Sequence, residues 1–300
     1  MSEKTIRIHV GAHKTATTYI QDTLALNQAA SAASGTAYWT REQFRSALSS
    51  AISGEKARRK SNLSSLAYRL LSQRRESVER LAGFFDLDLD ITISDENLLG
   101  EAHDCFSGQV YPSAPIYLNL LKDALPDRPV EILLCVRSYA SFLSSLYGES
   151  LRHGHFLRMV RFQEMHATGK KLWPNLVRVI HQAFPEATIS VWRYEDFARL
   201  EDQVLSRMTG LAPEAIVKPS QSDILPSASS DAILAFVEEA KSLSYTQRQF
   251  RMLALQISHP RGQGSGKFSL WDGAQKAQLA DEYDADIESL KKVGYVQFLG

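Results

Sequence analysis

The chain of 300 residues predicts an α/β fold in which a central parallel β-sheet is flanked by helices on both faces. Two observations lead to this expectation. Strand-like and helix-like segments alternate along much of the chain, which is the pattern of parallel strands joined by helical crossovers. The predicted strand Val130 to Val136 contains a continuous apolar run, as is usual for a strand covered on both faces.

The first predicted strand alternates apolar Ile6, Ile8 and Val10 with polar residues, and Gly11 to Thr15 then forms a tight turn. The other expected strands are Leu87–Ser94, Val130–Val136 and Ala187–Trp192. Helical patterns cover Thr17–Asn27, Arg41–Phe85 with an interruption at the basic segment Glu55–Lys60, a stretch ending near Leu125, Ser138–Arg152, Leu200–Thr209, the region from Pro226 to about Ile257, and about Gln275–Leu290. The small and polar segment Ala29–Thr36 is expected to be a loop.

No internal repeat or change in composition divides the chain, so we expect one domain over residues 1–300. Its expected additions are a helical insertion at about residues 38–85 and a loop at about residues 259–270 that could act as a lid. The residues before Thr5 include no apolar segment typical of a secretory leader, and no apolar run approaches membrane-spanning length. We therefore expect a cytoplasmic protein without a membrane span.

Charge and cysteine content argue against other classes of site. The 34 basic and 34 acidic side chains balance, which gives no support to nucleic-acid binding. The two cysteines and scattered histidines form no zinc-binding pattern, and we expect no metal. Cys135 lies within an apolar run and is expected to be a buried, reduced thiol.

The segment Gly11-Ala12-His13-Lys14-Thr15-Ala16-Thr17-Thr18 follows a strand and opens a helix. Backbone N–H groups at a helix N-terminus attract anions, and here a lysine and three threonine hydroxyls accompany them. The lysine stands three residues after the glycine, so this is not a Walker A loop. The alternative interpretation is an ordinary strand-to-helix turn with Thr17 as the N-cap. The lysine beside three hydroxyls favours a phosphate loop.

The same segment, continued to Gln21, resembles the 5′-phosphosulfate loop of sulfotransferases that use PAPS (3′-phosphoadenosine 5′-phosphosulfate). The resemblance implies a P-loop-like three-layer fold, PAPS as the sulfuryl donor and PAP as the product. Ala16 stands where the family commonly has glycine, so its methyl group is expected to affect the amide contact at that position.

A second point of resemblance is the pair Arg137 and Ser145. In the family, an arginine at a strand end and a serine eight residues later hold the 3′-phosphate of the donor. Arg137 has the planar fork of donors that suits a phosphate, and Ser145 lies two turns along the following helix. Tyr194 to Phe197 resembles a further family segment, which we interpret as structural.

The expected catalytic residues are Lys14 and Glu96. Lys14 would stabilise charge on the leaving phosphate, and Glu96 resembles the glutamate base of bacterial and carbohydrate sulfotransferases. Asp95 and the histidines His103, His153 and His155 are the alternative bases. Arg261-Gly262 and Gly266-Lys267 resemble, imperfectly, a late family segment that closes over the 3′-phosphate. The expected donor-binding residues are Gly11, His13, Lys14, Thr15, Ala16, Thr17, Thr18, Arg137, Ser145, Arg261 and Gly262.

The resemblance implies transfer of a sulfuryl group from PAPS to an acceptor hydroxyl on a small molecule or glycan, with a carbohydrate favoured. Two alternatives stay open. One is an ATP-dependent kinase for a nucleotide or small molecule with an atypical phosphate loop. The other is a nucleotide-binding protein without catalysis, which would need Lys14 and Arg137 but not Glu96.

Overall fold

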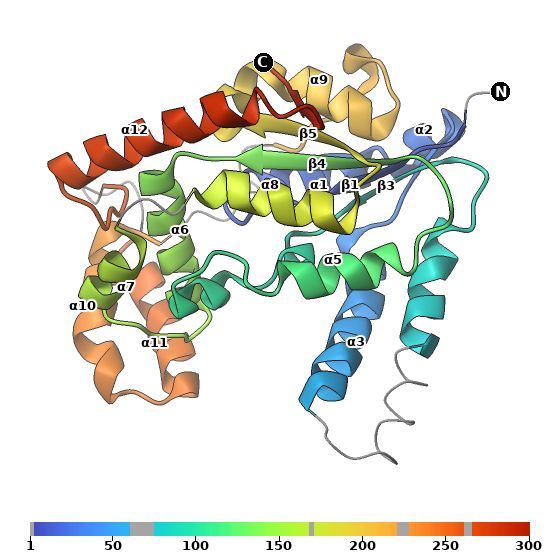
Figure 1. Ribbon diagram of the computed structural model, residues 1–300. Coiled ribbons are helices and arrows are strands. Elements are labelled where there is room, and N and C mark those ends of the chain that lie inside the picture. The colour runs from blue at the N-terminus through green and yellow to red at the C-terminus, as the bar shows by residue number, and fades with distance from the viewer. Residues whose placement is uncertain (1–2, 61–74, 168–170, 221–227, 261–265) are drawn as a thin grey trace.

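A six-stranded sheet, parallel throughout, forms the centre of the computed structural model, which describes residues 3–60, 75–167, 171–220, 228–260 and 266–300 (Figure 1). The strand order is β2-β3-β1-β4-β5-β6. Helices lie on both sides of the sheet, which confirms the predicted three-layer α/β architecture. The strands are β1 (Ile6–His9), β2 (Thr36–Tyr38), β3 (Asp90–Ser94), β4 (Val130–Val136), β5 (Thr188–Arg193) and β6 (Val296–Phe298).

The described helices vary widely in length. Residues 75–82 are also helical, and a short 3₁₀ turn η2 (Glu96–Leu98) follows β3. The α-helices with full bounds are α1 (Thr17–Leu26), α2 (Gln28–Ala33), α3 (Arg41–Lys60), α5 (Ala114–Lys122), α6 (Tyr139–Arg152), α7 (Met159–His166), α8 (Leu172–Ala183), α9 (Phe197–Thr209), α10 (Ser230–Glu239), α11 (Tyr245–Ser258) and α12 (Gly273–Leu290).

The alternation of side chains along β4 divides the apolar core in two. Ile132 and Leu134 belong to a large cluster with residues of α5, α6, α8 and α12. Leu133 and Cys135 belong to a smaller cluster with residues of α1 and α9. Burial of both faces of β4 explains its nearly continuous apolar run. Cys135 is buried and unpaired by any disulfide, as the apolar run predicted.

The expected loop at Ala29–Thr36 is wrong. Four alanines make this stretch a good helix former, and α2 occupies most of it. Gly35 then adopts a φ of 91°, which ends the helix, and Thr36 begins the edge strand β2. β2 pairs with β3, beginning with Thr36 beside Asp90. An edge strand of three residues is too short for periodicity to reveal.

Two expected helix limits also need correction. The helical backbone of α3 continues through Glu55–Lys60, because lysine and arginine are good helix formers and do not interrupt a helix. The helix expected from Pro226 to Ile257 is two helices, α10 and α11. Leu243 is extended, and Ser244 caps α11 in a reciprocal capping box with Gln247, a signal present in the sequence.

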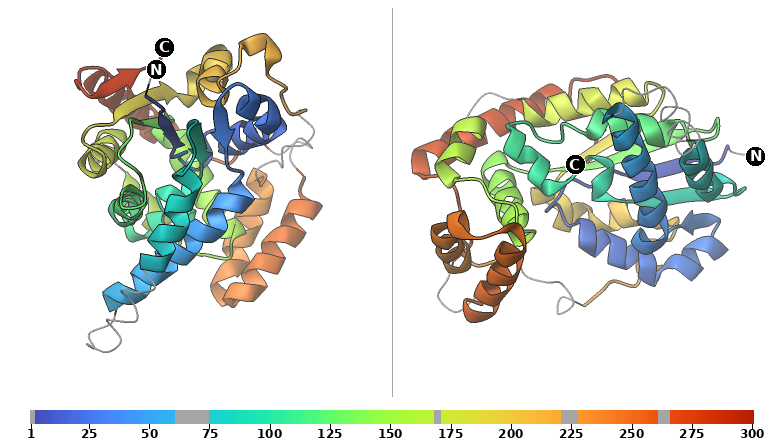
Figure 2. Two further views of the ribbon diagram at one scale, coloured as in Figure 1. Left: turned by 90° about the vertical axis from the view of Figure 1, so that its right-hand side faces the viewer. Right: turned by 90° about the horizontal axis from the view of Figure 1, so that it is seen from below.

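The helices outside the three layers form two projections from the body of the molecule. Figures 1 and 2 show α3 and residues 75–82 lying side by side and projecting away from the sheet. α10 and α11 pack against one another as a second projection, and α11 contacts α6. Among the described helices, none is both long enough and apolar enough to cross a bilayer.

Candidate functional site

Three strand-to-helix connections meet at the carboxyl edge of the sheet. The loop of residues 11–16 follows β1, Asp95 follows β3, and Arg137 follows β4. β1 lies between β3 and β4, with His9 in register with both Ser94 and Leu133. Ligands of open α/β sheets bind outside the carboxyl ends of the strands. The sequence therefore predicted correctly that Lys14, Glu96 and Arg137 follow neighbouring strands at one edge.

The loop of residues 11–16 adopts an unusual backbone conformation. Gly11, Lys14 and Ala16 have φ angles of 20°, 66° and 63°. A Cβ on Gly11 would lie 2.9 Å from the side chain of Thr17 and 3.1 Å from His9 Cε1, so glycine fits there where a side chain would clash. Ala16 takes the left-handed conformation that glycine adopts without strain, at the position where the resembling family commonly has glycine.

Ala16 is also the N-cap of α1, and no side chain caps this end of the helix. The alternative interpretation with Thr17 as the N-cap is therefore wrong. Within the described residues, the backbone N–H groups of Lys14 to Tyr19 donate to no acceptor. A run of unsatisfied N–H groups around left-handed residues at a helix N-terminus forms a concave site for an anion.

The threonine hydroxyls do not all face this site. Thr15 Oγ1 and Thr17 Oγ1 both donate to the carbonyl oxygen of Ala12, at 2.5 and 3.2 Å, and both side chains are buried. They hold the loop in shape. Thr18 is exposed on the first turn of α1.

Lys14 projects toward α6. Its Nζ lies 3.1 Å from Glu149 Oε2. A small pocket, open to solvent, adjoins this pair. Lys14 and Ser145, which the sequence predicted as donor-binding residues in separate segments, both line this pocket. The full lining is Lys14, Ser144, Ser145, Gly148, Glu149, Arg152, Ala228, Ile233, Lys267 and Phe268.

Arg137 stabilises the loop of residues 11–16 by a hydrogen bond to its backbone. Its guanidinium donates from Nη1 to the carbonyl oxygen of Lys14 and from Nε to Ser141 Oγ at 3.0 Å. The guanidinium also lies 4.5 Å from the ring centre of Tyr194. Arg137 is buried and does not line the pocket that contains Ser145. The two residues predicted to hold one phosphate therefore stand at different places around Lys14.

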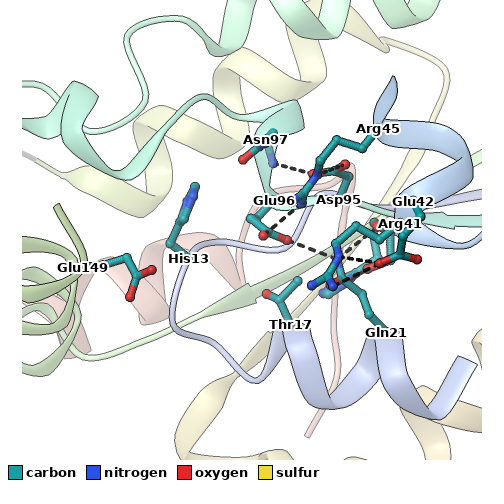
Figure 3. Close-up of polar contacts among 12 residues, drawn as sticks. His13, Thr17, Gln21, Arg41, Glu42, Arg45, Asp95, Glu96, Asn97 and Glu149 are labelled. Atoms are coloured by element: carbon teal, nitrogen blue, oxygen red, sulfur yellow. Dashed lines mark hydrogen bonds and ion pairs between the residues drawn. The ribbon is translucent and has the colours of Figure 1, made fainter. Parts of the chain in front are cut away.

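The carboxylates after β3 have different environments, as Figure 3 shows. Asp95 is fully buried, forms two hydrogen bonds with Arg45 at 2.7 and 3.0 Å, and accepts from the N–H of Asn97. Glu96 is 20% exposed. Its Oε1 accepts from Arg45 at 3.0 Å and its Oε2 from Gln21 at 3.1 Å. Of these two candidate bases, only Glu96 remains open to a substrate.

The electrostatics of Glu96 follow from these contacts. Burial raises the pKa of Glu96, but Arg45, His13 and hydrogen bonds lower it by more, so the net pKa lies below the ordinary value. Burial lowers the pKa of His13, with Glu96 and Glu149 opposing. Figure 3 shows His13 between these two glutamates. Glu96 is therefore ionised and His13 neutral near neutral pH.

Sequence reasoning missed several partners of the predicted residues. Tyr111 Oη accepts from the His13 N–H at 2.8 Å and lies 3.1 Å from His13 Nδ1. Arg45 binds both carboxylates after β3, and Glu149 binds Lys14. Glu149 stands four residues after Ser145 on α6, so this helical spacing was a usable signal.

The remaining predicted residues fall into two groups. Arg261 and Gly262 lie outside the described residues, while Lys267 lines the pocket and forms an antiparallel bridge with Ser229. The histidines His103 and His155 stack with ring centres 3.6 Å apart, and His153 Nε2 lies 3.1 Å from Glu149 Oε1. Within the described part of the chain, no three His, Cys, Asp or Glu side chains form a group that could hold a metal ion.

Comparisons of this chain with protein-family models, with curated proteins and with solved structures gave no match. We therefore infer function from the chemistry of the site.

Proposed function

We propose that this protein is a PAPS-dependent sulfotransferase that moves a sulfuryl group to an acceptor hydroxyl, with a carbohydrate as the favoured acceptor. The observation that carries the proposal is the run of N–H groups from Lys14 to Tyr19 that find no acceptor among the described residues, in a loop that also carries the Lys14 ammonium. Such a site suits the phosphosulfate of a nucleotide. The resemblance of this loop to the 5′-phosphosulfate loop supports PAPS as the particular nucleotide.

The proposed reaction is an in-line displacement at sulfur. The acceptor oxygen forms a bond to sulfur while the bond from sulfur to the bridging phosphate oxygen breaks, and PAP leaves. Negative charge grows on the bridging oxygen, where Lys14 stabilises it. Glu96 takes the proton of the acceptor hydroxyl, because it is ionised and partly exposed at the same sheet edge.

The 3′-phosphate of the donor is proposed to bind near Ser145, which lines the same pocket as Lys14. Arg152 and Lys267 also line this pocket and add positive charge there. Arg137, which lies outside this pocket, is proposed to contribute by fixing the carbonyl of Lys14. Its direct contact with the donor phosphate, implied by the resemblance, stays a prediction that the Arg137→Ala variant tests. The segment of Arg261 and Gly262 retains its proposed role over the donor.

Binding measurements with three ligands test the class of nucleotide. We expect PAP to raise the melting temperature, and neither ATP nor ATP with magnesium to do so. Stabilisation by ATP with magnesium, and none by PAP, would support a kinase instead. Incubation of a panel of small-molecule alcohols and glycans with labelled PAPS would then identify the acceptor, and binding of PAP without any turnover would indicate a nucleotide-binding protein.

Arg137→Ala tests the second anchor. A charge-assisted hydrogen bond contributes about 1.5–3 kcal/mol, so the variant should bind PAP roughly 10- to 150-fold more weakly by calorimetry. Arg178→Ala is the matched control, since Arg178 is an exposed arginine on α8 bonded to Asn175. Equal affinity of wild type and Arg137→Ala for PAP would remove Arg137 from the donor site.

A further inference from the structure

We infer that Glu149 is a positioning residue, an inference that rests on the proposed donor site. Glu149 holds the Lys14 ammonium and must release it before an anion binds. Glu149 thereby sets the affinity of the site. The starting observation is the 3.1 Å contact between Lys14 Nζ and Glu149 Oε2, in which the side chains are 23% and 12% exposed.

The two oxygens of Glu149 have separate partners. Oε2 contacts Lys14 of the loop, whereas Oε1 accepts from Arg152 at 2.5 Å and lies 3.1 Å from His153 Nε2. Arg152 is the last residue of α6 and His153 is its C-cap. They stand three and four residues after Glu149, the spacings at which side chains on one helix face meet. When Lys14 moves to a ligand, Glu149 therefore keeps its helical partners, and the carboxylate does not become a buried, unpaired charge.

Competition for Lys14 follows from the chemistry of its ammonium. A phosphate or phosphosulfate oxygen at the loop N–H groups needs the same positive charge that Glu149 neutralises. Ser145 lies one helical turn before Glu149, and both line the pocket. An anion at Ser145 would also be repelled by the Glu149 carboxylate. Both effects weaken anion binding, so loss of the carboxylate should strengthen it.

The ion pair itself can be tested without a nucleotide. Glu149→Gln keeps the shape of the side chain and removes its charge. We expect acetic anhydride, read out by mass spectrometry, to modify the Lys14 amine several-fold faster in Glu149→Gln than in the wild type, because the Lys14 nitrogen is no longer held against a carboxylate and is freer to meet the reagent. Glu164→Gln is the matched control, since it removes a carboxylate paired with Arg161 on the neighbouring helix α7.

Calorimetry with inorganic pyrophosphate and with PAP tests the competition. Close charge pairs have large coupling energies, so both ligands should bind about 5- to 30-fold more tightly to Glu149→Gln than to the wild type. Their affinity for Glu164→Gln should equal that for the wild type. A purely structural role for Glu149 would weaken binding. Circular dichroism verifies folding, and Glu149→Ala replaces the first variant if that one does not fold.

The outcomes separate this inference from the proposed function. Tighter pyrophosphate binding with no PAP binding to either protein would support the role of Glu149 and refute PAP as the ligand. PAP binding to the wild type that is not tightened in the variant would overturn the role of Glu149 and leave the proposed function standing. Unchanged modification of Lys14 would overturn the role of Glu149 whatever the ligands do.

Discussion

Asp95 and Glu96 show, at the scale of single residues, how adjacent carboxylates acquire different roles. Asp95 is enclosed, and its oxygens bind Arg45 and the backbone of the following 3₁₀ turn. Glu96 shares Arg45 but keeps partial exposure. Arg45 thus anchors the first carboxylate and tunes the basicity of the second.

The proposed base is tested by Glu96→Gln, which keeps the size of the side chain and removes its basicity. Turnover should fall roughly 10²- to 10⁴-fold, the usual contribution of a general base, while the PAP dissociation constant stays near the wild-type value. The measurement is initial rate with labelled PAPS and an identified acceptor. Retained turnover in the variant would exclude Glu96 as the base.

The tuning by Arg45 predicts a pH effect. A base acts when ionised, and the pKa of Glu96 lies below its ordinary value of 4.5, so kcat/KM of the wild type should fall only below that pH. Arg45→Gln removes one cause of the lowering, so the pKa of Glu96 should rise and the acid limb should move to higher pH. The pH–rate profile measures the shift.

Arg41→Gln is the control for that profile, because Arg41 lies on the same helix and binds the exposed Glu42 instead. Its acid limb should match that of the wild type. An unmoved limb in Arg45→Gln, with PAP binding intact, would contradict the assignment of Glu96.

At the scale of elements, the β1–α1 connection holds its shape through contacts from three other parts of the chain. Tyr111 accepts from His13, Arg137 donates to the carbonyl of Lys14, and Glu149 holds the side chain of Lys14. The loop includes left-handed Ala16, a conformation that costs an L-residue about 1–2 kcal/mol. The rest of the structure therefore maintains a strained turn at the anion site, as is common at functional sites.

Ala16→Gly should stabilise the protein. Glycine relieves the left-handed strain but also loosens the unfolded chain, which leaves a gain of about 0.5–1 kcal/mol in the free energy of unfolding. Urea denaturation measures this. The control Ala25→Gly, at an exposed position within α1, should instead destabilise by about 1 kcal/mol. Equal destabilisation by both variants would show that Ala16 is not strained.

At the scale of the whole molecule, a buried histidine at the carboxyl end of β1 makes stability depend on pH. His9 lies fully buried in the centre of the sheet, with Nδ1 2.8 Å from Ser94 Oγ and its ring stacked on Trp192. Burial lowers its pKa from 6.5 to about 4, against a smaller opposing effect of Glu96. The folded protein therefore keeps His9 neutral at pH values where the unfolded chain would protonate it.

This shift predicts acid-sensitive stability. The contribution of His9 is fully present above pH 6.5 and is lost as the pH falls toward about 4, because protonation favours the unfolded chain. Between pH 7.5 and pH 5 the free energy of unfolding should fall by about 2 kcal/mol from this residue. Urea denaturation of the wild type and of His9→Gln at both pH values measures the contribution of His9 to the free energy of unfolding.

The comparison contains its own control, because any packing effect of His9→Gln is present at both pH values and cancels in the difference. The variant should show a smaller loss of stability between the two pH values than the wild type. The same loss in both proteins would mean that other groups cause the acid sensitivity.

The sequence by itself determined the parts of this protein that depend on neighbouring residues. Apolar alternation in β1 and the apolar run of β4 define strands, and parallel strands place their carboxyl ends at one edge. That reasoning was enough to bring Lys14, Glu96 and Arg137 to the same edge of the sheet. It also predicted a buried Cys135 and the three-layer architecture.

Only the tertiary structure decided which side chains meet. The contacts of His13 with Tyr111, of Arg45 with Asp95 and of Lys14 with Glu149 span 98, 50 and 135 residues. The edge strands β2 and β6 have three residues each, too few for a period to appear. Such pairings depend on how crossovers pack and which strands become edges, and these are properties of the assembled sheet that local patterns of residues do not encode.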